Sequence, residues 1–357
     1  MKILITIYKL NISGSATYTL TLANELKKNG HKLIVFCPII SELLPEFKKF
    51  GIKVVDNIKN IKYEKFDIII AQHSVIAILV RKYFFNIPMV FISHGVLPLL
   101  EQPPSVELNI SHYIAVSEEV RSNLIDNYNI SEHNISIVRN GVDTKIFFES
   151  QAIKKKLKSV LFLTHHRNLK VITNVTRACR RKKLKLMIVG VRDRQLDVKK
   201  YINKVDLVIS LGRGVLESMS CGRAVIVYDY NGGDGMVLSN NINNIKQKNF
   251  SGRKFSYNYN VRDLIKEFNK YNQSLGIINR KLIKNEFDIS ITVNKLEKVI
   301  KMSIHNFNFK KLSIPNSQID LICEKLKLAN KTHGPRVKIV KELKKLLIIS
   351  VLKILRQ

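Results

Sequence analysis

The stretch VDLVISLGRGVLESMSCGRAVIVYDYNGGDG, which runs from Val205 to Gly235, decides the fold of this chain. It opens with a short apolar run, Val205–Ile209, of the kind that forms a buried parallel strand. The loop Ser210–Gly214 and a short helix follow, and we expect Gly222 to end that helix as the residue after its last turn. A second apolar run leads into the glycine-rich loop NGGDG. Strand, glycine loop, helix and strand form the arrangement that directs free backbone N–H groups and a positive helix end toward an anion.

The same alternation of apolar strands and helices extends over the rest of the chain. The first connecting segment, for example, predicts a helix from about Ala16 to Lys28. Repeated βα units predict parallel, doubly wound sheets, in which ligands bind at the carboxyl ends of the strands. We expect further strands at Ile3–Ile7, His31–Phe36, Ile52–Val55, Asp67–Ala71, Met89–Ile92, Tyr113–Val116, Ile135–Val138, Val160–Leu163 and Leu184–Val189.

Length and charge limit the class of protein. With 357 residues the chain suits two domains, each with its own core. Its net charge of +32 favours anionic partners such as nucleic acid, acidic glycans or anionic lipid surfaces. A lysine-, isoleucine- and asparagine-rich composition explains the same charge without any function, and both explanations stay open. A nucleic-acid-binding protein is the weaker alternative, because no basic stripe with interleaved aromatics is present, and we expect no nucleic-acid partner.

The four cysteines are scattered and form no Cys-x-x-Cys pair, which indicates reduced thiols in a cytosolic protein. No signal peptide is visible at the start of the sequence, and no apolar run reaches the roughly 18 residues of a membrane-spanning helix. No Asp-x-Asp motif occurs, and the pair His165-His166 has no acidic or cysteine ligands at metal-binding spacing. We therefore expect neither a metal nor another cofactor.

The segment Leu216–Ile226 resembles the donor-binding motif of the family-4 retaining glycosyltransferases, which runs L-E-A-M-A-C-G-x-P-V-I. The resemblance implies the GT-B fold, in which two Rossmann-like, doubly wound domains face each other across a cleft. It also implies that Glu217 contacts the ribose of a nucleotide-sugar, although the helix dipole alone favours a glutamate in a first helical turn. The family usually has a second glutamate eight residues earlier, where this chain has Ile209. We expect the rest of the donor-binding loop at Gly212, Arg213, Gly214 and Val215.

Two further blocks, AVSEEVRSNL from Ala115 and ISIVRNGVDTKIF from Ile135, resemble the family patterns V-S-x-x-V-R-x-x-L and I-x-V-I-P-N-G-V-D-x-x-x-F. In the family the Asn-Gly turn of the second block, here Asn140-Gly141, closes the first domain and borders the cleft. The resemblance therefore gives Asn140 and Asp143 a place at the hinge rather than in the chemistry. The predicted parts are an acceptor-side domain 1–152, a nucleotide-sugar domain 153–288, a helix 289–304 that crosses back to the first domain, and a tail 305–357.

A basic segment after the strand Val160–Leu163 resembles the family's G-R-x-x-x-K, whose arginine and lysine bind the donor diphosphate. Here the glycine is missing and the spacing is one residue shorter. Arg167 and Lys170 are the substitutes, since a guanidinium pairs well with phosphate oxygens. A solvated basic helix start explains the same residues without a ligand. Gly190 ends the next strand, at the position where the nucleobase usually lies in this family.

Two sites are predicted in the first domain. The residues Ser13, Gly14 and Ser15 resemble the glycine pair before the family's first helix, which implies contact with an acceptor or a phosphate. An ordinary helix cap is the alternative, since serine is a favoured N-cap residue. His94 follows a predicted strand, at the edge where ligands bind, and in the family a histidine of this region lines the reaction centre. We predict a catalytic position for His94, with a structural histidine as the alternative.

These features predict a metal-independent retaining glycosyltransferase. It would move a sugar from a UDP- or GDP-sugar to a hydroxyl of a growing cell-surface glycan, such as lipopolysaccharide, O-antigen or capsule, on a lipid-linked acceptor. A helix N-terminus with arginine and lysine can stabilise the diphosphate leaving group without a metal. Ile209 and the altered phosphate segment keep an alternative open, a GT-B protein that has lost transfer and acts as a partner subunit.

The segment Arg336–Arg356 is amphipathic and carries seven lysine or arginine residues against one glutamate. A basic amphipathic helix can lie on an anionic membrane surface, and it can equally pack on its own protein or on a partner. We expect a cytoplasmic protein, or one held peripherally on the inner face of the cell membrane.

Overall fold

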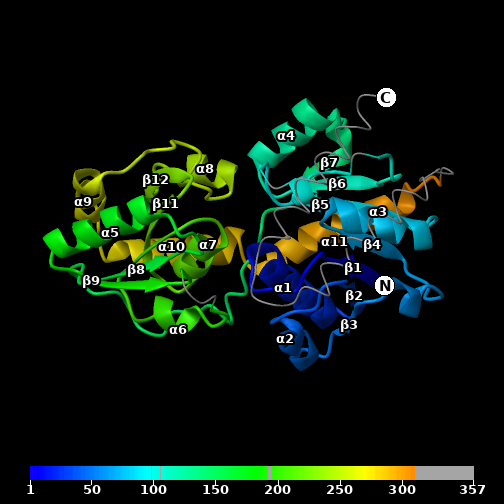
Figure 1. Ribbon diagram of the computed structural model, residues 1–357, viewed down its shortest axis with the longest axis horizontal. Coiled ribbons are helices and arrows are strands. Elements are labelled where there is room, and N and C mark those ends of the chain that lie inside the picture. The colour runs from blue at the N-terminus through cyan, green and yellow to red at the C-terminus, as the bar shows by residue number, and fades with distance from the viewer. Residues whose placement is uncertain (98, 105, 192–194, 310–357) are drawn as a thin grey trace. The chain divides into compact units, whose positions relative to one another are not determined.

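The computed structural model describes residues 1–97, 99–104, 106–191 and 195–309 (Figure 1). The predicted membrane-binding segment Arg336–Arg356 lies outside the described residues, as does Cys323. The other three cysteines are buried free thiols, and burial raises the pKa of each to about 12: Cys37, Cys179 and Cys221.

The chain divides into two compact units. Unit 1 contains Met1–Ile114, Leu124–Ser136 and the chain from Lys298, and unit 2 contains Ala115–Asn123 and Ile137–Glu297. The domain boundary that we predict between residues 152 and 153 stays a prediction.

The first sheet has seven strands in the order β3-β2-β1-β4-β5-β6-β7. β1 runs parallel to β2 on one side and to β4 on the other, with Leu4 opposite Ile34 and Ile69. Because the order reverses at β1, the carboxyl ends of β1 and β4 flank the switch point at which doubly wound sheets bind ligands. The strands are β1 (Lys2–Thr6), β2 (Lys32–Phe36), β3 (Lys53–Val55), β4 (Ile68–Ala71), β5 (Met89–Ser93), β6 (His112–Ala115) and β7 (Ile135–Ile137).

Both faces of this sheet are buried. Leu4 and Ile69 pack in one cluster with the residues of α3, whereas Ile3 and Ile5, which point to the opposite face, are also fully buried. The alternation of strands with helices produces this cover (Figure 1). The helices are α1 (Gly14–Lys28), α2 (Leu44–Lys49), α3 (Ser74–Tyr83) and α4 (Glu118–Tyr128), with short 3-10 turns at Ile58–Ile61, Leu99–Glu101 and Glu132–Asn134.

The second sheet has five strands in the order β12-β11-β10-β8-β9. β8, β9, β10 and β11 are parallel, and β12 runs antiparallel to β11. The order reverses at β8, so the second switch point lies between the carboxyl ends of β8 and β10. The strands are β8 (Ser159–Leu163), β9 (Lys185–Val189), β10 (Leu207–Ser210), β11 (Ala224–Asp229) and β12 (Gly232–Met236).

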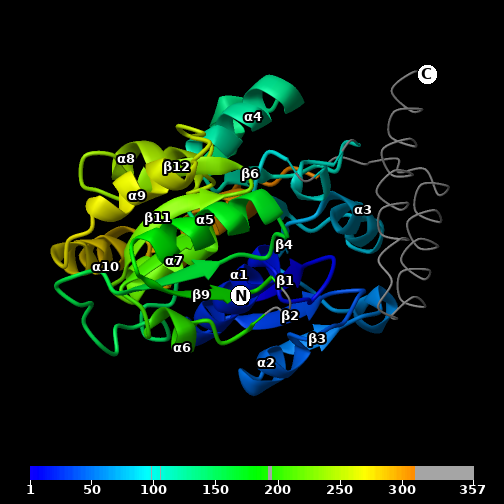
Figure 2. The same cartoon turned by 60° about the vertical axis from the view of Figure 1, so that its left-hand side comes forward.

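Helices also cover both faces of the second sheet. Val160 and Phe162 belong to one core cluster with α5 and α9, which lie side by side (Figure 1, Figure 2), whereas Leu161 and Leu163 pack with α6. The helices of this unit are α5 (Leu169–Arg181), α6 (Lys199–Ile202), α7 (Arg213–Ser220), α8 (Ile242–Ile245), α9 (Val261–Asn269) and α10 (Ser274–Glu286), with a 3-10 turn at Lys246–Lys248. The last helix, α11 (Ile289–His305), has residues in both units.

The helix at the centre of the decisive stretch, α7, ends as predicted. Gly222 has φ +70, and its N–H donates to the carbonyl oxygen of Met219. The next N–H, that of Arg223, donates to the carbonyl oxygen of Ser218. This pair of bonds is the Schellman motif, in which glycine is favoured because its φ is positive.

The glycine-rich end of the same stretch differs from the prediction, because NGGDG is not a loop but forms most of β12. Gly233 lies beneath aromatic rings, and an added Cβ there would lie 2.4 Å from Tyr259 Cε2 and 2.9 Å from Tyr228 Cδ2. Glycine in a strand often marks such a close approach. Packing of the two tyrosines therefore explains why residues with low strand propensity pair with β11.

A buried arginine, Arg223, ties the segment before β8 to the connection between α7 and β11. Its guanidinium donates to the carbonyl oxygens of Cys221 (2.8 Å), Val205 (2.9 Å) and Gln151. Glu149 lies beside it, with 3.8 Å between Nη2 of the arginine and Oε1 of the glutamate. The side chain of Arg223 is 2 % exposed, so the preceding segment is part of the packing of unit 2.

Candidate functional site

The carboxyl edge of the second sheet brings together the loops that follow β8, β9, β10 and β11. At the switch point, the hydroxyl of Ser210 at the end of β10 donates to the carbonyl oxygen of Leu163 at the end of β8 over 2.8 Å. α7 begins at Arg213, directly after this point. The positive end of a helix dipole therefore lies where a doubly wound sheet binds its ligand, which favours an anion.

The turn into α7 is made by Gly212, which has φ +56 and where an added Cβ would meet no atom within 4 Å. Its N–H donates to the carbonyl oxygen of Phe250 over 2.8 Å. Gly214 is tightly packed, because a Cβ there would lie 2.4 Å from Ser210 Oγ. Val215 is fully buried and its N–H donates to the carbonyl oxygen of Gly212. A donor contact of Val215 stays a prediction.

Glu217 and Arg213, one turn apart on α7, form a buried ion pair. Arg213 Nε lies 2.7 Å from Glu217 Oε1, and the two side chains are 12 % and 10 % exposed. The arginine also donates from Nη1 to the carbonyl oxygen of Gly141 over 3.2 Å. Burial raises the pKa of Glu217, and Arg213 opposes that rise. The guanidinium thus favours the ionised carboxylate, which can accept hydrogen bonds through both oxygens.

The turn with the two predicted hinge residues lies in unit 2. Asp143 caps the chain that follows it, because its Oδ1 accepts from the N–H groups of Lys145 and Ile146 at 2.9 and 3.1 Å. Asn140 donates from Nδ2 to Asn249 Oδ1 over 3.5 Å. These contacts fit an architectural role for Asn140 and Asp143, and movement at this turn stays a prediction.

The residues predicted to bind the donor diphosphate and base lie at the ends of β8 and β9. Gly190 has φ +97, and an added Cβ would lie 2.5 Å from the carbonyl oxygen of Thr164, so glycine permits the close approach of the two loops. Arg167 is exposed and donates from Nε to the carbonyl oxygen of Val191 over 3.2 Å. Lys170 is exposed in the first turn of α5. Donor contacts of these residues stay predictions.

The structure adds a contact across the end of β10 that the sequence did not predict. Thr164, just after β8, donates from Oγ1 to Oδ2 of Asp229, the last residue of β11, over 2.5 Å and accepts from the N–H of His166 over 3.0 Å. The rings of His166 and Tyr230 lie 3.7 Å apart, centroid to centroid. Because β10 lies between β8 and β11, these contacts bridge over its carboxyl end. We refer to Thr164, His166, Asp229 and Tyr230 as the β10 arch.

In unit 1, His94 directly follows β5 and contacts the residue that follows β4. Its Nε2 lies 2.8 Å from Gln72 Oε1. Gln72 donates from Nε2 to Thr19 Oγ1 (2.9 Å) and to the carbonyl oxygen of Thr6 (3.4 Å), which fixes its Oε1 toward the histidine. Since that oxygen only accepts, His94 carries its proton on Nε2 and keeps Nδ1 as an acceptor. The ring of Tyr18 packs edge-on against the imidazole, with centroids 4.8 Å apart.

Two buried histidines make the stability of unit 1 depend on pH. Burial lowers the pKa of His94 to about 4 and, with a contribution from His94, that of His73 to about 3. The unfolded chain takes up both protons near pH 6.5, so acid favours unfolding and stability falls as the pH drops from 6.5 toward 4. The contribution of Glu101 to stability depends on pH in the opposite direction. Burial raises the pKa of Glu101 to about 7, so its contribution weakens as the pH rises from 4.5 to 7.

Between pH 4.5 and 6.5 acidification weakens the contribution of His73 and His94 and strengthens that of Glu101. Burial also lowers the pKa of a third histidine of this unit, His112, which acts in the same direction as the other two. We therefore expect a net loss of stability on acidification. Urea unfolding at pH 7.5 and at pH 5 should show a free energy of unfolding lower by about 1–3 kcal/mol at pH 5. The difference should shrink in His94→Gln, which cannot be protonated, and persist when the exposed His133 is replaced by glutamine. An undiminished difference in His94→Gln would contradict the assignment.

The predicted loop before α1 is an N-cap in this structure. Ser13 Oγ accepts from the N–H of Ala16 at 3.4 Å. Gly14 is exposed, and an added Cβ would meet no atom within 4 Å. The carbonyl oxygen of Ser15 accepts from Thr19 Oγ1 at 2.8 Å. Capping therefore accounts for Ser13, while a ligand contact at the open backbone of Gly14 stays a prediction.

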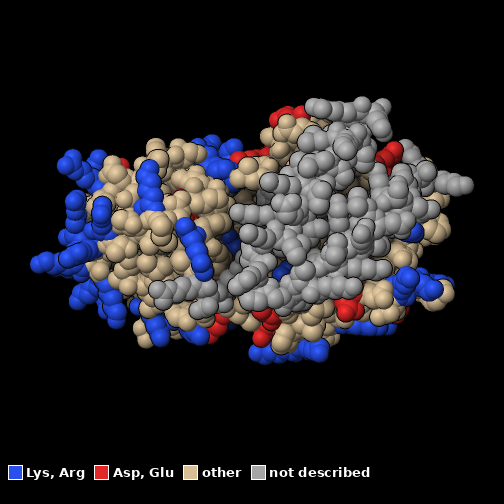
Figure 3. Space-filling view, viewed as in Figure 1, with Lys and Arg blue, Asp and Glu red and all other residues tan. Residues whose placement is uncertain are grey.

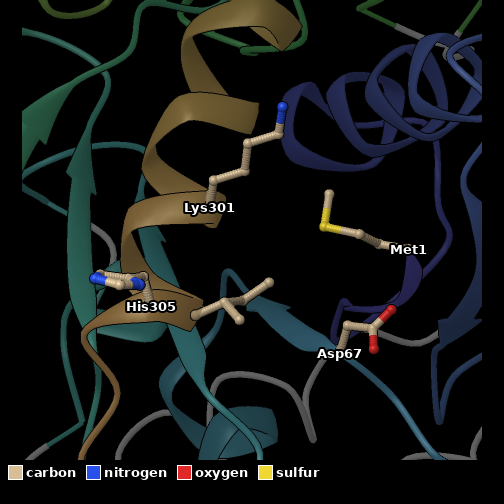
Figure 4. Close-up of a pocket in the computed structure, with 5 residues that line it drawn as sticks. Met1, Asp67, Lys301 and His305 are labelled. Carbon is tan, nitrogen blue, oxygen red and sulfur yellow. The ribbon is translucent and has the colours of Figure 1, made fainter.

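A hollow of about 570 Å³ lies at the opposite, amino edge of the first sheet (Figure 4). Figure 4 shows Lys301 and His305 on one helix, across from Met1 and Asp67, which precede β1 and β4. Doubly wound sheets bind their ligands at the carboxyl edge, so this hollow is not our candidate for the active site.

Among the residues that the structure describes, no helix is long and apolar enough to cross a membrane. Within the same ranges, no three His, Cys, Asp or Glu side chains come together in a group that could hold a metal ion.

Comparison with known proteins agrees with this architecture. Residues 12–146 match the model of Glycosyltransferase Family 4, and no curated protein sequence matches the chain. Similar solved structures include a glycosyltransferase from Rickettsia africae (17% identity over 85% of this chain and 99% of that chain, TM-score 0.61) and Anabaena HepE in complex with UDP-glucose (12%, 85% and 100%, 0.60). A third is a glycosyltransferase involved in avilamycin A biosynthesis (11%, 87% and 100%, 0.53).

At these identities the structural likeness shows the fold alone. That fold is the predicted one, two Rossmann-like units of the GT-B type, each with its own doubly wound sheet. The family match over residues 12–146 adds the class of activity to the fold.

Proposed function

Since this chain is a glycosyltransferase of the GT-B type, we propose that it is a metal-independent retaining enzyme that transfers a sugar from a UDP- or GDP-sugar to a hydroxyl of a growing cell-surface glycan. The observation that carries the proposal is the buried pair of Glu217 and Arg213 on α7, at the switch point of the second sheet. A helix N-terminus favours phosphate, and an ionised carboxylate accepts ribose hydroxyls. Anabaena HepE was solved with UDP and with UDP-glucose, which supports a UDP-sugar here.

The transfer needs a stabilised diphosphate leaving group. A diphosphate in the open space beside Gly212 would lie at the positive end of α7, which begins with Arg213. The exposed Arg167 and Lys170 add positive charge from the β8 side of the same edge. We propose that these groups together stabilise the leaving charge, so that the reaction requires no cofactor.

We propose that unit 1 binds the acceptor hydroxyl. His94 is neutral at pH 7, because burial lowers its pKa to about 4, and its Nδ1 remains an acceptor. A neutral imidazole at the carboxyl edge of the sheet is suited to accept a hydrogen bond from a sugar hydroxyl. The chain thereby supplies an acceptor-binding group without a charged base.

We propose further that the acceptor is lipid-linked and that the protein works at an anionic membrane surface. The supporting observation is the basic surface of unit 2, where lysine and arginine side chains gather around the end of α5 (Figure 3). Exposed basic residues there include Arg180, Arg181, Lys182, Lys183 and Lys185. Each basic group near an anionic bilayer contributes about 1 kcal/mol of binding. The segment Arg336–Arg356 is proposed as a second contact from outside the described residues.

A second candidate is a GT-B protein without transfer activity that acts as a partner subunit. Ile209 favours it, because this side chain is fully buried in β10, paired with Ile226 on one side and Phe162 on the other. No carboxylate can reach the sugar from that position. Nucleotide binding without any turnover would favour this candidate.

Calorimetric titration with UDP, GDP, ADP and TDP tests the donor site. We expect UDP or GDP to bind with a dissociation constant of about 1 μM to 1 mM, the usual range for an enzyme substrate. The matching sugar nucleotides would then be screened for transfer to glycan acceptors. If none of the four nucleotides binds to the folded protein, the proposed function is wrong.

A further inference from the structure

The β10 arch holds a carboxylate that is only half satisfied. Asp229 is 3 % exposed, and its Oδ2 accepts from Thr164 Oγ1. Within the described part of the chain, its Oδ1 is buried and has no hydrogen-bond partner. The N–H of Tyr230 is close enough to favour the ionised form but makes no hydrogen bond to Oδ1. A buried acceptor without a donor costs free energy, so a ligand hydroxyl that donates to Oδ1 would be favoured.

The position of Asp229 places this acceptor beside the proposed donor site. Asp229 ends β11, two residues past the pairing of Val227 with Ser210 on β10. β10 turns through Gly212 into α7 immediately after Ser210. The unpaired oxygen therefore belongs to the same edge as the helix end at which we place the diphosphate. In a nucleotide-sugar the group attached to the outer phosphate is the sugar.

The ring pair of the arch supplies the second half of a sugar site. Tyr230 is 45 % exposed, and its ring is covered on one side by the exposed imidazole of His166. A sugar ring has an apolar C–H face that packs on an aromatic ring and hydroxyls that donate to a carboxylate. The two exposed side chains can separate without disturbing a core. Thr164 keeps Asp229 in place while they do so.

A hydroxyl fits the unpaired oxygen better than a cation. A metal ion requires several ligands, and no group of three His, Cys, Asp or Glu in the described residues could hold one. Burial raises the pKa of Asp229, while the Thr164 hydrogen bond and the nearby His166 lower it. The oxygen that Thr164 leaves unpaired is an acceptor for a hydroxyl.

We propose that Asp229 and Tyr230 bind the sugar of the donor, with Asp229 Oδ1 accepting a sugar hydroxyl and the Tyr230 ring packing on the sugar once its contact with His166 opens. The inference rests on the proposed donor site and names the part of the donor that the β10 arch recognises. Asp229 and Tyr230 are thereby specificity-determining residues of the transfer.

The test compares each nucleoside diphosphate with its sugar nucleotide on the full chain. Calorimetry gives the dissociation constants of UDP, UDP-glucose and UDP-galactose, and of GDP and GDP-mannose. In Asp229→Asn, the amide oxygen can still accept from Thr164, so the arch should persist. For the sugar nucleotide that binds, we divide its dissociation constant by the dissociation constant of the corresponding nucleoside diphosphate. We expect this ratio to rise about tenfold in Asp229→Asn, which is the effect of losing one hydrogen bond to a charged group. The constant for the diphosphate alone should change less than about twofold.

Two further variants complete the experiment. Tyr230→Ala removes an exposed ring, should fold, and should raise the same ratio, so it carries the test if Asp229→Asn does not fold. Asp263→Asn is the matched control, because Asp263 caps α9 outside the arch, and its ratio should equal that of the wild type. An unchanged ratio in both arch variants overturns the inference and leaves the donor site intact. A loss of UDP binding itself in folded Asp229→Asn also overturns it, since Asp229 would then serve the nucleotide. Failure of the wild type to bind any nucleotide removes the proposed function and this inference together.

Discussion

Replacing Glu217 by glutamine is expected to weaken nucleotide binding by about 10- to 100-fold, which is the effect of losing one or two hydrogen bonds to a charged acceptor. The same change leaves Arg213 buried without its carboxylate partner. Breaking a buried ion pair in this way costs about 3–5 kcal/mol, so the melting temperature should fall as well. Calorimetry with UDP or GDP, and thermal unfolding of the same samples, measure the two effects.

A double variant separates the ligand role of Glu217 from its role as the partner of Arg213. Arg213→Gln combined with Glu217→Gln removes both charges and should recover much of the lost stability, but not the nucleotide binding. The matched control is Glu286→Gln, whose carboxylate pairs with Lys246 at 2.9 Å and is 41 % exposed. It should leave both measurements unchanged. Recovery of binding in the double variant would show that the nucleotide does not need the carboxylate, and that the loss in Glu217→Gln came from the unpaired Arg213.

A single methyl group at Gly141 is expected to destabilise unit 2 by about 2–3 kcal/mol, the upper part of the range for overpacked sites. An added Cβ would lie 2.6 Å from Thr292 Oγ1 and 2.9 Å from the Cα of Ile289. The hydroxyl can rotate away, but the Cα belongs to the backbone at the start of α11. The neighbouring Val142 is fixed there too, since its N–H donates to the carbonyl oxygen of Phe287 and its carbonyl oxygen accepts from the N–H of Ile289.

Urea unfolding of Gly141→Ala measures this effect, and Gly14→Ala is its control. At Gly14 an added Cβ meets nothing within 4 Å, so alanine should be neutral or stabilising by up to about 1 kcal/mol. Nucleotide binding should weaken in Gly141→Ala as well, because the carbonyl oxygen of Gly141 holds Arg213. Wild-type stability of Gly141→Ala would mean that the turn and α11 move apart freely.

The sequence predicted those features that depend on neighbours along the chain. Apolar runs gave the strands, and the glycine at the end of α7 has the positive φ that its position requires. The ion pair of Arg213 and Glu217 joins residues four apart on one helix, so both residues could be assigned to the same site in advance. Ser13 illustrates the limit of such reasoning, because an N-cap and a phosphate loop call for the same small polar residue.

Features that depend on the order of the strands escaped prediction. Thr164 and Asp229 are 65 positions apart in sequence, and they meet because β8 and β11 flank β10. Nothing local to either segment indicates that order. The close approach of Gly233 to two tyrosine rings is likewise non-local, so NGGDG was wrongly predicted as a loop. A polar residue at the carboxyl end of a buried strand was the available signal for Asp229.

The buried guanidinium of Arg223 determines where the donor-binding half can be cut out for separate expression. Its acceptor Gln151 and its neighbour Glu149 both precede residue 153, and Ser220 donates to the carbonyl oxygen of Phe147. A fragment that begins at residue 153 would leave the buried donors of Arg223 and Ser220 without these acceptors. Such a fragment should aggregate or give little folded protein. A fragment that begins before Val142 keeps every one of these acceptors. The part of the chain that can fold alone therefore begins well before β8, the first strand of the second sheet. Fragments made for separate expression should include these preceding residues.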